Sequence, residues 1–127
     1  MDLSPRRFAD ALVLRPTGTI DHITAPAFRA ALDPHLTNCT AGGDRVVLDF
    51  SEVPYISSAG LRVLILASKQ AKAQGGTIAV AALQPLPIEI FAISRFDMVL
   101  TAFPTVGEAL AELSPAAHAA FNATGGA

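Results

Sequence analysis

The chain has 127 residues, of which 51% are hydrophobic, and its formal net charge is −2. This length supports one packed core and is too short for two ordinary domains. Its nine Lys and Arg residues are spread along the chain, so the sequence has no basic stripe for phosphate backbones and we expect no nucleic-acid partner. No apolar run approaches the roughly 18 residues that span a bilayer, and the start, MDLSPRRF, lacks the apolar stretch of a signal peptide. We therefore expect no membrane insertion and a soluble protein of the cytoplasm.

The N-terminal half predicts a strand pair, a helix and a buried strand. Residues 11–20 contain two short β runs broken at a Pro-Thr-Gly sequence, which favours a hairpin or a bent edge pair. A helix is expected to begin after Thr24, with Pro26 in its first turn, and Pro34 should end or kink it. After a polar loop, the sequence RVVLDF has the nearly continuous apolar character of a strand covered on both faces.

The second half alternates helices and strands. From Gly60 the apolar residues recur at helical spacing until a pair of glycines stops the pattern. A strand, a short helix, a strand and a final helix are then expected over residues 77–83, 85–94, 98–103 and 105–113. The short helix is expected to point Ile88, Phe91 and Ala92 inward.

The predicted order of elements is β-β-α-β-α-β-α-β-α, which defines the fold class as α/β. Such alternation implies a mixed sheet of about five strands, mostly parallel in its later strands, with helices packed on it. Thr105 followed by Glu108 is the capping-box pattern and marks the start of the last helix. We expect the domain to comprise residues 1–113, and residues 114–127, which lose the periodicity, to form a flexible C-terminal tail.

The usual enzyme signatures are missing from the sequence. It contains no GxGxxG, GxxxxGK[ST], HExxH or GxSxG motif. Cys39 has no second cysteine with which to form a disulfide or share a metal. His22, His35 and His118 lack metal-ligand spacing and read as solvated surface groups. We expect a protein that is not an enzyme, with no catalytic residue, no cofactor and no metal.

Residues 55–62, YISSAGLR, place two hydroxyls where an apolar strand gives way to an apolar helix. Ser57 or Ser58 could cap that helix, a role worth on the order of 1 kcal/mol. Either could also accept a phosphate, since a helix N-terminus offers unpaired N–H groups and the positive end of a dipole. A phosphate adds a charge of about −1.5 to −2, which would disrupt a partner fitted to the bare hydroxyl. The two roles are compatible, and both stay open.

The span from about Leu12 to Leu113 resembles a STAS domain of the bacterial anti-sigma-factor antagonist type. The resemblance is carried by LVLRPTGTID followed by ITAPAFRAAL, in which Gly18 and Asp21 match, and by VVLDFSEVPYISSAGLRVLILASKQAKAQGG. It implies a regulator that binds an anti-sigma factor, usually a serine kinase of the histidine-kinase-like ATPase superfamily, and releases a sigma factor by partner switching. In such proteins, phosphorylation of one serine in the turn abolishes binding, and a serine phosphatase is a further partner that the resemblance leaves open.

The turn departs from the family pattern at the modified position. The common sequence is Asp-Ser-Ser-Gly, with the modified serine directly before the glycine, whereas residues 57–60 here are Ser-Ser-Ala-Gly. Ala59 therefore stands where the phosphoacceptor is expected. Three explanations are open. The modification has moved to Ser58, our first choice, or to Ser57. Alternatively, the protein binds its partner constitutively, or it belongs to a branch that works without phosphorylation. The last alternative would make it a STAS subunit of a signalling scaffold or of an ABC-type lipid transporter.

The helix that follows the turn predicts a partner-facing surface. Arg62, Leu66 and Lys69 should face away from its buried stripe. An exposed leucine between two cations suggests a modest interface, although single exposed leucines are common and both readings stay open. Arginine is over-represented at interface hot spots, so Arg62 could alter the choice of partner. The predicted partner-binding residues are Asp21, Ser57, Ser58, Ala59, Gly60, Arg62, Leu66 and Lys69.

Overall fold

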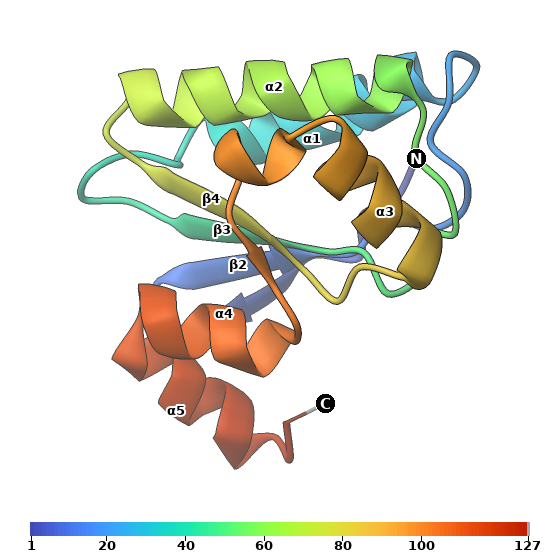
Figure 1. Cartoon of the computed structure of the whole chain (residues 1–127). Helices are drawn as coiled ribbons and strands as arrows, with labels where there is room; N and C mark the ends of the chain where they lie inside the picture. The colour runs from blue at the N-terminus through green and yellow to red at the C-terminus, as the bar shows by residue number, and fades with distance from the viewer. Residues whose placement is uncertain (127) are drawn as a thin grey trace.

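The computed structural model describes residues 1–126 and contains a five-stranded sheet (Figure 1). The strands are β1 (Arg6–Phe8), β2 (Ala11–Leu14), β3 (Arg45–Asp49), β4 (Thr77–Ala81) and β5 (Ala102–Phe103), and they lie in this order across the sheet. β1 runs antiparallel to β2, and the other neighbours are parallel. In the register, Leu12 pairs with Val46 and Val46 with Ile78, so these apolar side chains share one face. The predicted α/β fold with a mixed sheet is confirmed.

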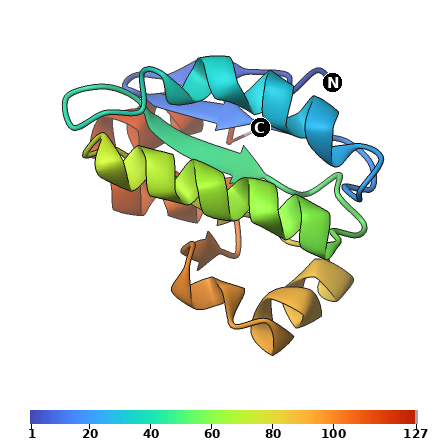
Figure 2. The same cartoon turned by 90° about the horizontal axis from the view of Figure 1, so that it is seen from above.

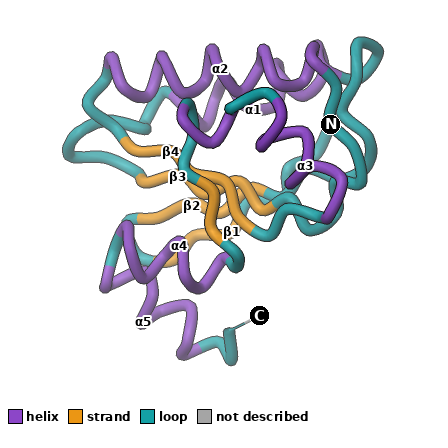
Figure 3. The backbone as a smooth tube through the Cα atoms, viewed as in Figure 1, coloured by secondary structure: helices purple, strands orange, loops and turns teal. Residues whose placement is uncertain are grey.

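Helices cover both faces of the sheet (Figures 1 and 3). They are α1 (Ala25–Leu36), α2 (Ser58–Ala73), α3 (Pro85–Ile93), the 3-10 turn η1 (Phe96–Met98), α4 (Val106–Leu113) and α5 (Pro115–Ala123). α1 and α2 cover one face, α4 and α5 cover the other, and α3 lies at the side. β3 packs into both layers, because Val46 and Leu48 join the core under α1 and α2 while Val47 joins the core under α4 and α5. This two-sided burial is what its continuous apolar sequence predicts.

The first strand pair lies earlier in the chain than predicted. β1 and β2 form an antiparallel hairpin that turns at Ala9, whose φ of 52° is left-handed. The predicted β run near residue 20 makes only an isolated bridge between Ile20 and Ile56. β1 escaped prediction because Arg6 and Arg7 are exposed, so its three residues carry no apolar alternation.

Helix α1 passes through Pro34 and ends at Leu36, so of the two outcomes predicted at Pro34, an end or a kink, the end was wrong. Pro34 cannot donate the helical hydrogen bond to the residue four positions before it. Leu32 and Leu36 flank it and are 0% and 1% exposed, so they hold the last turn on the core. Their burial offsets the missing bond.

The segment from α3 to β5 also differs from the prediction. Phe91 is buried as expected, but Ile88 is 52% exposed and Ala92 is exposed, so two of the three side chains predicted to point inward do not. The segment 98–103 is strand only in its last two residues, because η1 and a bend precede β5. These differences place apolar side chains on the surface.

The structure differs from the flexible tail expected after residue 113, because α5 packs against the sheet. Ser114 caps this helix, with its Oγ accepting a hydrogen bond from the Ala117 N–H at 3.1 Å. Phe121 is buried and meets Phe8 edge to face, with ring centroids 5.2 Å apart. The sequence signal was weak because alanines make up most of the helix and only Phe121 supplies a large apolar group.

Candidate functional site

Backbone hydrogen bonds bring the turn before α2 beside the loop before α1. The Ile20 N–H donates to the Tyr55 carbonyl at 3.0 Å, and the Ser57 N–H donates to the Ile20 carbonyl at 2.8 Å. The two segments are 35 residues apart in the chain, yet they form one surface at the N-terminal end of α2 (Figure 1). We call this surface, formed by residues 21–29, 55–62 and 66, the α2 N-terminal site.

The two serines of the turn occupy different environments. Ser57 occupies the N-cap position of α2, with an extended backbone (φ −88°, ψ 177°). Its carbonyl accepts a hydrogen bond from the Leu61 N–H. Its Oγ makes no capping bond and is buried without a hydrogen-bond partner among the residues described. Ser58 is exposed. The capping bond considered for Ser57 is therefore absent, and Ser58 is the serine of the pair that solvent and partners can reach.

Ala59 and Gly60 form the buried side of the turn. Ala59 is half-buried and packs against the main core, and Gly60 is fully buried against Ile20 and Ile56. Gly60 has no side chain, so the first turn of α2 can approach the Ile20 loop closely. Both residues shape the site, and neither can accept a phosphate.

Asp21 fixes the start of α1. Its Oδ1 accepts from the N–H groups of Ile23 at 2.9 Å and Thr24 at 3.1 Å, while the Thr24 Oγ1 accepts from the Asp21 N–H at 3.0 Å. The bonds from the Thr24 and Ile23 N–H groups lower the pKa of the Asp21 carboxyl, so it stays ionised. Asp21 thus positions the loop that contacts the turn before α2. Thr24 stands at the predicted N-cap position, but its side chain makes no capping bond to α1.

A shallow groove of about 290 Å³ runs between the N-terminal halves of α1 and α2. Its lining residues are His22, Ala25, Pro26, Arg29, Ala59, Arg62, Val63 and Leu66. The structure thus brings three predicted partner residues, Ala59, Arg62 and Leu66, to one groove. Leu66 is half-buried and not exposed as predicted, because α1 lies beside it. Lys69 is exposed further along α2 and does not line the groove.

The groove is cationic. Arg29 pairs with Asp33 at 3.0 Å within α1, whereas Arg62 has no ion pair among residues 1–126. Among the residues that the structure describes, no carboxylate lines the groove. A partner that presents carboxylates would therefore match its charge.

Two exposed apolar residues of the site were not among the partner-binding residues predicted from the sequence. Ile23 is 74% exposed and Tyr55 is 40% exposed, on the two loops that the Ile20 bonds join. Large exposed apolar side chains beside a cationic groove are typical of a protein-binding surface. One apolar residue in a polar turn is too common a signal to have identified either of them.

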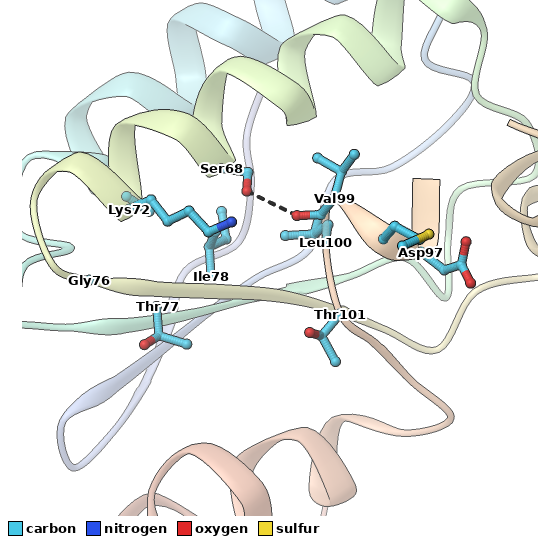
Figure 4. Close-up of a pocket in the computed structure, with 11 residues that line it drawn as sticks. Ser68, Lys72, Gly76, Thr77, Ile78, Asp97, Val99, Leu100 and Thr101 are labelled. Carbon is cyan, nitrogen blue, oxygen red and sulfur yellow. Dashed lines mark hydrogen bonds between the residues drawn. The ribbon is translucent and has the colours of Figure 1, made fainter. Parts of the chain in front are cut away.

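A second cavity, of about 320 Å³, lies under the C-terminal half of α2 (Figure 4). Lys72 and Asp97 lie on opposite sides of it, and the Ser68 Oγ donates to the Val99 carbonyl at 3.2 Å. The Ser68 hydroxyl is thus engaged with the backbone. Within residues 1–126, no group of three or more His, Cys, Asp or Glu side chains could hold a metal ion. Over the same span, no helix has the length and apolar character needed to cross a membrane.

The fold and the site together define an α/β domain that presents the start of one helix inside an apolar and cationic surface. The family model for the STAS domain matches residues 3–109, and the chain belongs to this family. The family predicted from the sequence is confirmed.

Known relatives agree with this assignment. BtrV of Bordetella bronchiseptica, named for a proposed role as an anti-sigma factor antagonist, is 35% identical over 121 residues, which cover 95% of each chain. A Thermotoga maritima protein with the same proposed role has a structure that superimposes with a TM-score of 0.78, at 20% identity over 87% of this chain and 93% of that one. The anti-sigma factor antagonist SpoIIAA of Bacillus, in its unphosphorylated form, superimposes with a TM-score of 0.70, at 17% identity over 88% and 96% of the two chains. At these identities the two structures show the shared fold.

Proposed function

We propose that this chain is a cytoplasmic anti-sigma-factor antagonist that binds an anti-sigma factor through the α2 N-terminal site. The partner would be a serine kinase with the histidine-kinase-like ATPase fold, and phosphorylation of Ser58 would release it. Membership of the STAS family and the likeness to BtrV support this class of function. The observation that carries the proposal is the exposure of Ser58 at the start of α2, within a surface that also exposes the apolar residues Ile23 and Tyr55.

The chemistry of the surface supports a protein partner. Ile23 and Tyr55 offer apolar area that would be removed from water on binding. Arg62, which lacks an ion pair within the described chain, would pair with a carboxylate of the partner. We therefore expect an acidic, partly apolar patch on the anti-sigma factor.

Ser58 is the hydroxyl best placed for a phosphate switch. The kinase would transfer the γ-phosphoryl group of ATP to the Ser58 Oγ, which loses its proton, and a serine phosphatase would hydrolyse the ester. The first N–H groups of α2 have no side-chain cap and would stabilise the phosphate. Arg62 is four residues further on and so lies on the same face of the helix. A phosphate on Ser58 would engage Arg62 and add negative charge at the centre of the interface.

Binding titrations with the purified anti-sigma factor test the proposal. We expect Ser58→Asp to weaken binding at least tenfold, whereas Ser58→Ala should keep the affinity and abolish phosphate incorporation from ATP. Ser57→Ala is the matched control and should retain both properties, because the Ser57 Oγ is buried. Equal affinities for the wild type and Ser58→Asp would contradict the switch.

Ala59 favours a second function. Because the family's phosphoacceptor position carries no hydroxyl, the same site could bind constitutively, as in a STAS subunit of a signalling scaffold or of an ABC-type lipid transporter. Affinity purification from the native cells, with mass spectrometry of partners and of the 55–62 peptide, distinguishes the two. An anti-sigma kinase with phosphate on Ser58 supports the switch, and scaffold or transporter subunits with an unmodified peptide support the alternative.

A further inference from the structure

The N-terminal half of β4 is an open edge of the sheet. β5 pairs with only the last two residues of β4, although β3 pairs with all five. Before Thr101 the chain has left the sheet, because the Leu100 N–H donates to the Phe96 carbonyl of η1 at 3.1 Å. Seen from above, η1 and α3 lie beside the middle and the N-terminal part of α2, and no other described segment lies beside its C-terminal end on that side (Figure 2). We call the uncovered residues, Thr77–Ala79, the β4 edge.

The main-chain groups of Ile78 point outward from this edge. In a strand, the N–H and C=O groups of successive residues alternate between the two sides. The Ala81 carbonyl accepts from the Phe50 N–H on the β3 side at 2.9 Å. The Val80 N–H donates to the Thr101 carbonyl on the β5 side at 3.0 Å. Ile78, two residues before Val80, therefore faces the β5 side, where the described residues offer its N–H and C=O no hydrogen-bond partner. Ile78 is only 9% exposed, and main-chain groups so little exposed are almost always paired.

A hollow lies beside the β4 edge on each face of the sheet. The hollow on the α2 side is the cavity of about 320 Å³ described above (Figure 4), and the hollow on the α4 side has a volume of about 360 Å³. Thr77, Ile78 and Thr101 line both, so the two hollows adjoin along the edge. An added strand would lie about 4.8 Å from β4, and its side chains would enter the two hollows alternately. The edge thus offers room for a main chain and for its side chains.

The two hollows would receive different side chains. Lys72, on the last turn of α2, lines the α2-side hollow and makes no ion pair within residues 1–126. Asp97, the other charged residue of that lining, lies on the opposite side of the hollow (Figure 4). The α4-side hollow is lined by the apolar residues Phe103 and Leu113, with Glu112 as its charged residue. A strand with a carboxylate toward Lys72 and apolar side chains toward α4 would match both hollows.

We propose that the β4 edge binds an extended segment of a partner protein as an added antiparallel strand. The central residue of this segment would form a hydrogen-bonded pair with Ile78, donating its N–H to the Ile78 carbonyl and accepting from the Ile78 N–H. Its side chain is a carboxylate that reaches Lys72, and the two flanking side chains are apolar. A second copy of the chain fits less well, because pairing two β4 edges about a two-fold axis would bring both Lys72 ammonium groups to one face of the joined sheet. The proposal does not depend on what binds the α2 N-terminal site.

NMR titration of the full chain with the blocked peptide Ac-Thr-Val-Glu-Val-Thr-NH2 tests the added strand. This peptide has the required alternation and is built mostly from residues that favour strands. We expect a saturable shift of the Ile78 amide signal, with a dissociation constant of about 0.1–5 mM. N-methylation of the central Glu removes the N–H that bonds Ile78 and should weaken binding at least tenfold. N-methylation of the following Val is the matched control, because that N–H points away from β4, and binding should stay within about twofold.

A charge exchange tests the side-chain contact. Lys72→Glu should weaken binding of the parent peptide about threefold, and a peptide with Lys in place of its Glu should bind Lys72→Glu more tightly than the wild type. Lys69→Glu is the matched control, because Lys69 is an exposed lysine of α2 that lines neither hollow. Four results would overturn the proposal: an Ile78 amide that does not shift at about 5 mM peptide, equal losses with the two methylated peptides, equal effects of the two lysine substitutions, or self-association of the chain through the β4 edge.

Discussion

Gly60 lies so close to Ile20 that a Cβ on residue 60 would stand 2.8 Å from the Ile20 Cγ2. The same Cβ would be 2.6 Å from the Ile56 Cγ1, and both isoleucines are fully buried. Neither side chain can turn toward solvent to make room. The close approach of α2 to the Ile20 loop, which builds the α2 N-terminal site, therefore requires a glycine at this position.

We expect Gly60→Ala to lower the free energy of unfolding by about 1–3 kcal/mol in urea denaturation. Alanine would favour the helix by up to about 1 kcal/mol, but the clash with two buried isoleucines outweighs this gain. Gly42→Ala is the control, because a Cβ there meets nothing within 4 Å, and its stability should stay within about 0.5 kcal/mol of the wild type. A Gly60→Ala protein as stable as the wild type would show that α2 can shift without cost.

Ser57→Ala should raise the free energy of unfolding by about 0.5–1.5 kcal/mol, because it removes a buried hydroxyl that has no hydrogen-bond partner. A serine that capped α2 would give the opposite sign, a loss of about 1 kcal/mol. Thr105→Ala is the comparison, since the Thr105 Oγ1 does accept the Glu108 N–H at 3.1 Å. It should lose about 1 kcal/mol in the same urea titration. Equal losses in the two variants would mean that Ser57 caps its helix in solution.

Phe121→Ala should lower the free energy of unfolding by about 2–4 kcal/mol, because the ring is buried and packs edge to face on Phe8. The flexible tail expected from the sequence would instead make this substitution neutral. The neighbouring Asn122 is exposed, and Asn122→Ala should change stability by no more than about 0.5 kcal/mol. Chemical denaturation of the two variants decides whether α5 belongs to the folded core.

The sequence predicted well those elements whose apolar residues recur over a long span. α2 has 16 residues, and its spacing predicts that Leu61, Leu64, Ile65, Ser68 and Ala71 share the inward side. All of these are buried except Ile65, which is half-buried. α3 has only nine residues and is apolar nearly all round, so its pattern could not tell that Ile88 would face outward. In short elements the tertiary contacts, and not the period, decide which residues are buried.

In the candidate site too, contiguous residues were predicted from the sequence, whereas features that depend on tertiary contacts were not. The turn at residues 57–60 was recognised because its residues are contiguous and resemble a family sequence. Ile23 joins it through the hydrogen bonds of Ile20, between segments far apart in the chain. Tyr55 stands two residues before the turn, and its exposure depends on how that segment packs. The burial of the Ser57 Oγ likewise depends on that packing. Neither the apolar period nor the spacing of motifs contains such long-range information.

Acid should weaken the contact between α5 and the hairpin of β1 and β2. The Asp10 carboxylate accepts the Ser114 hydroxyl and pairs with Arg45 at 2.7 Å, and the Ser114 bond is the main cause of the lowered pKa of Asp10. Arg7, hydrogen-bonded to Asp44 at 2.9 and 3.0 Å, lowers the pKa of Asp44 in the same way.

A carboxyl group whose pKa is lower in the folded chain stabilises the fold at pH values above its unfolded pKa, which is about 3.9 for Asp. This contribution is lost as the pH falls through the lower, folded value. We therefore expect the free energy of unfolding to be level from pH 7 to about 5 and to fall below about pH 4. Asp10→Asn and Asp44→Asn should each make that fall shallower in urea titrations at a series of pH values. Asp2→Asn is the control, since Asp2 is exposed and outside these pairs. Parallel pH profiles for the wild type and both test variants would show that solvent screens the two pairs completely.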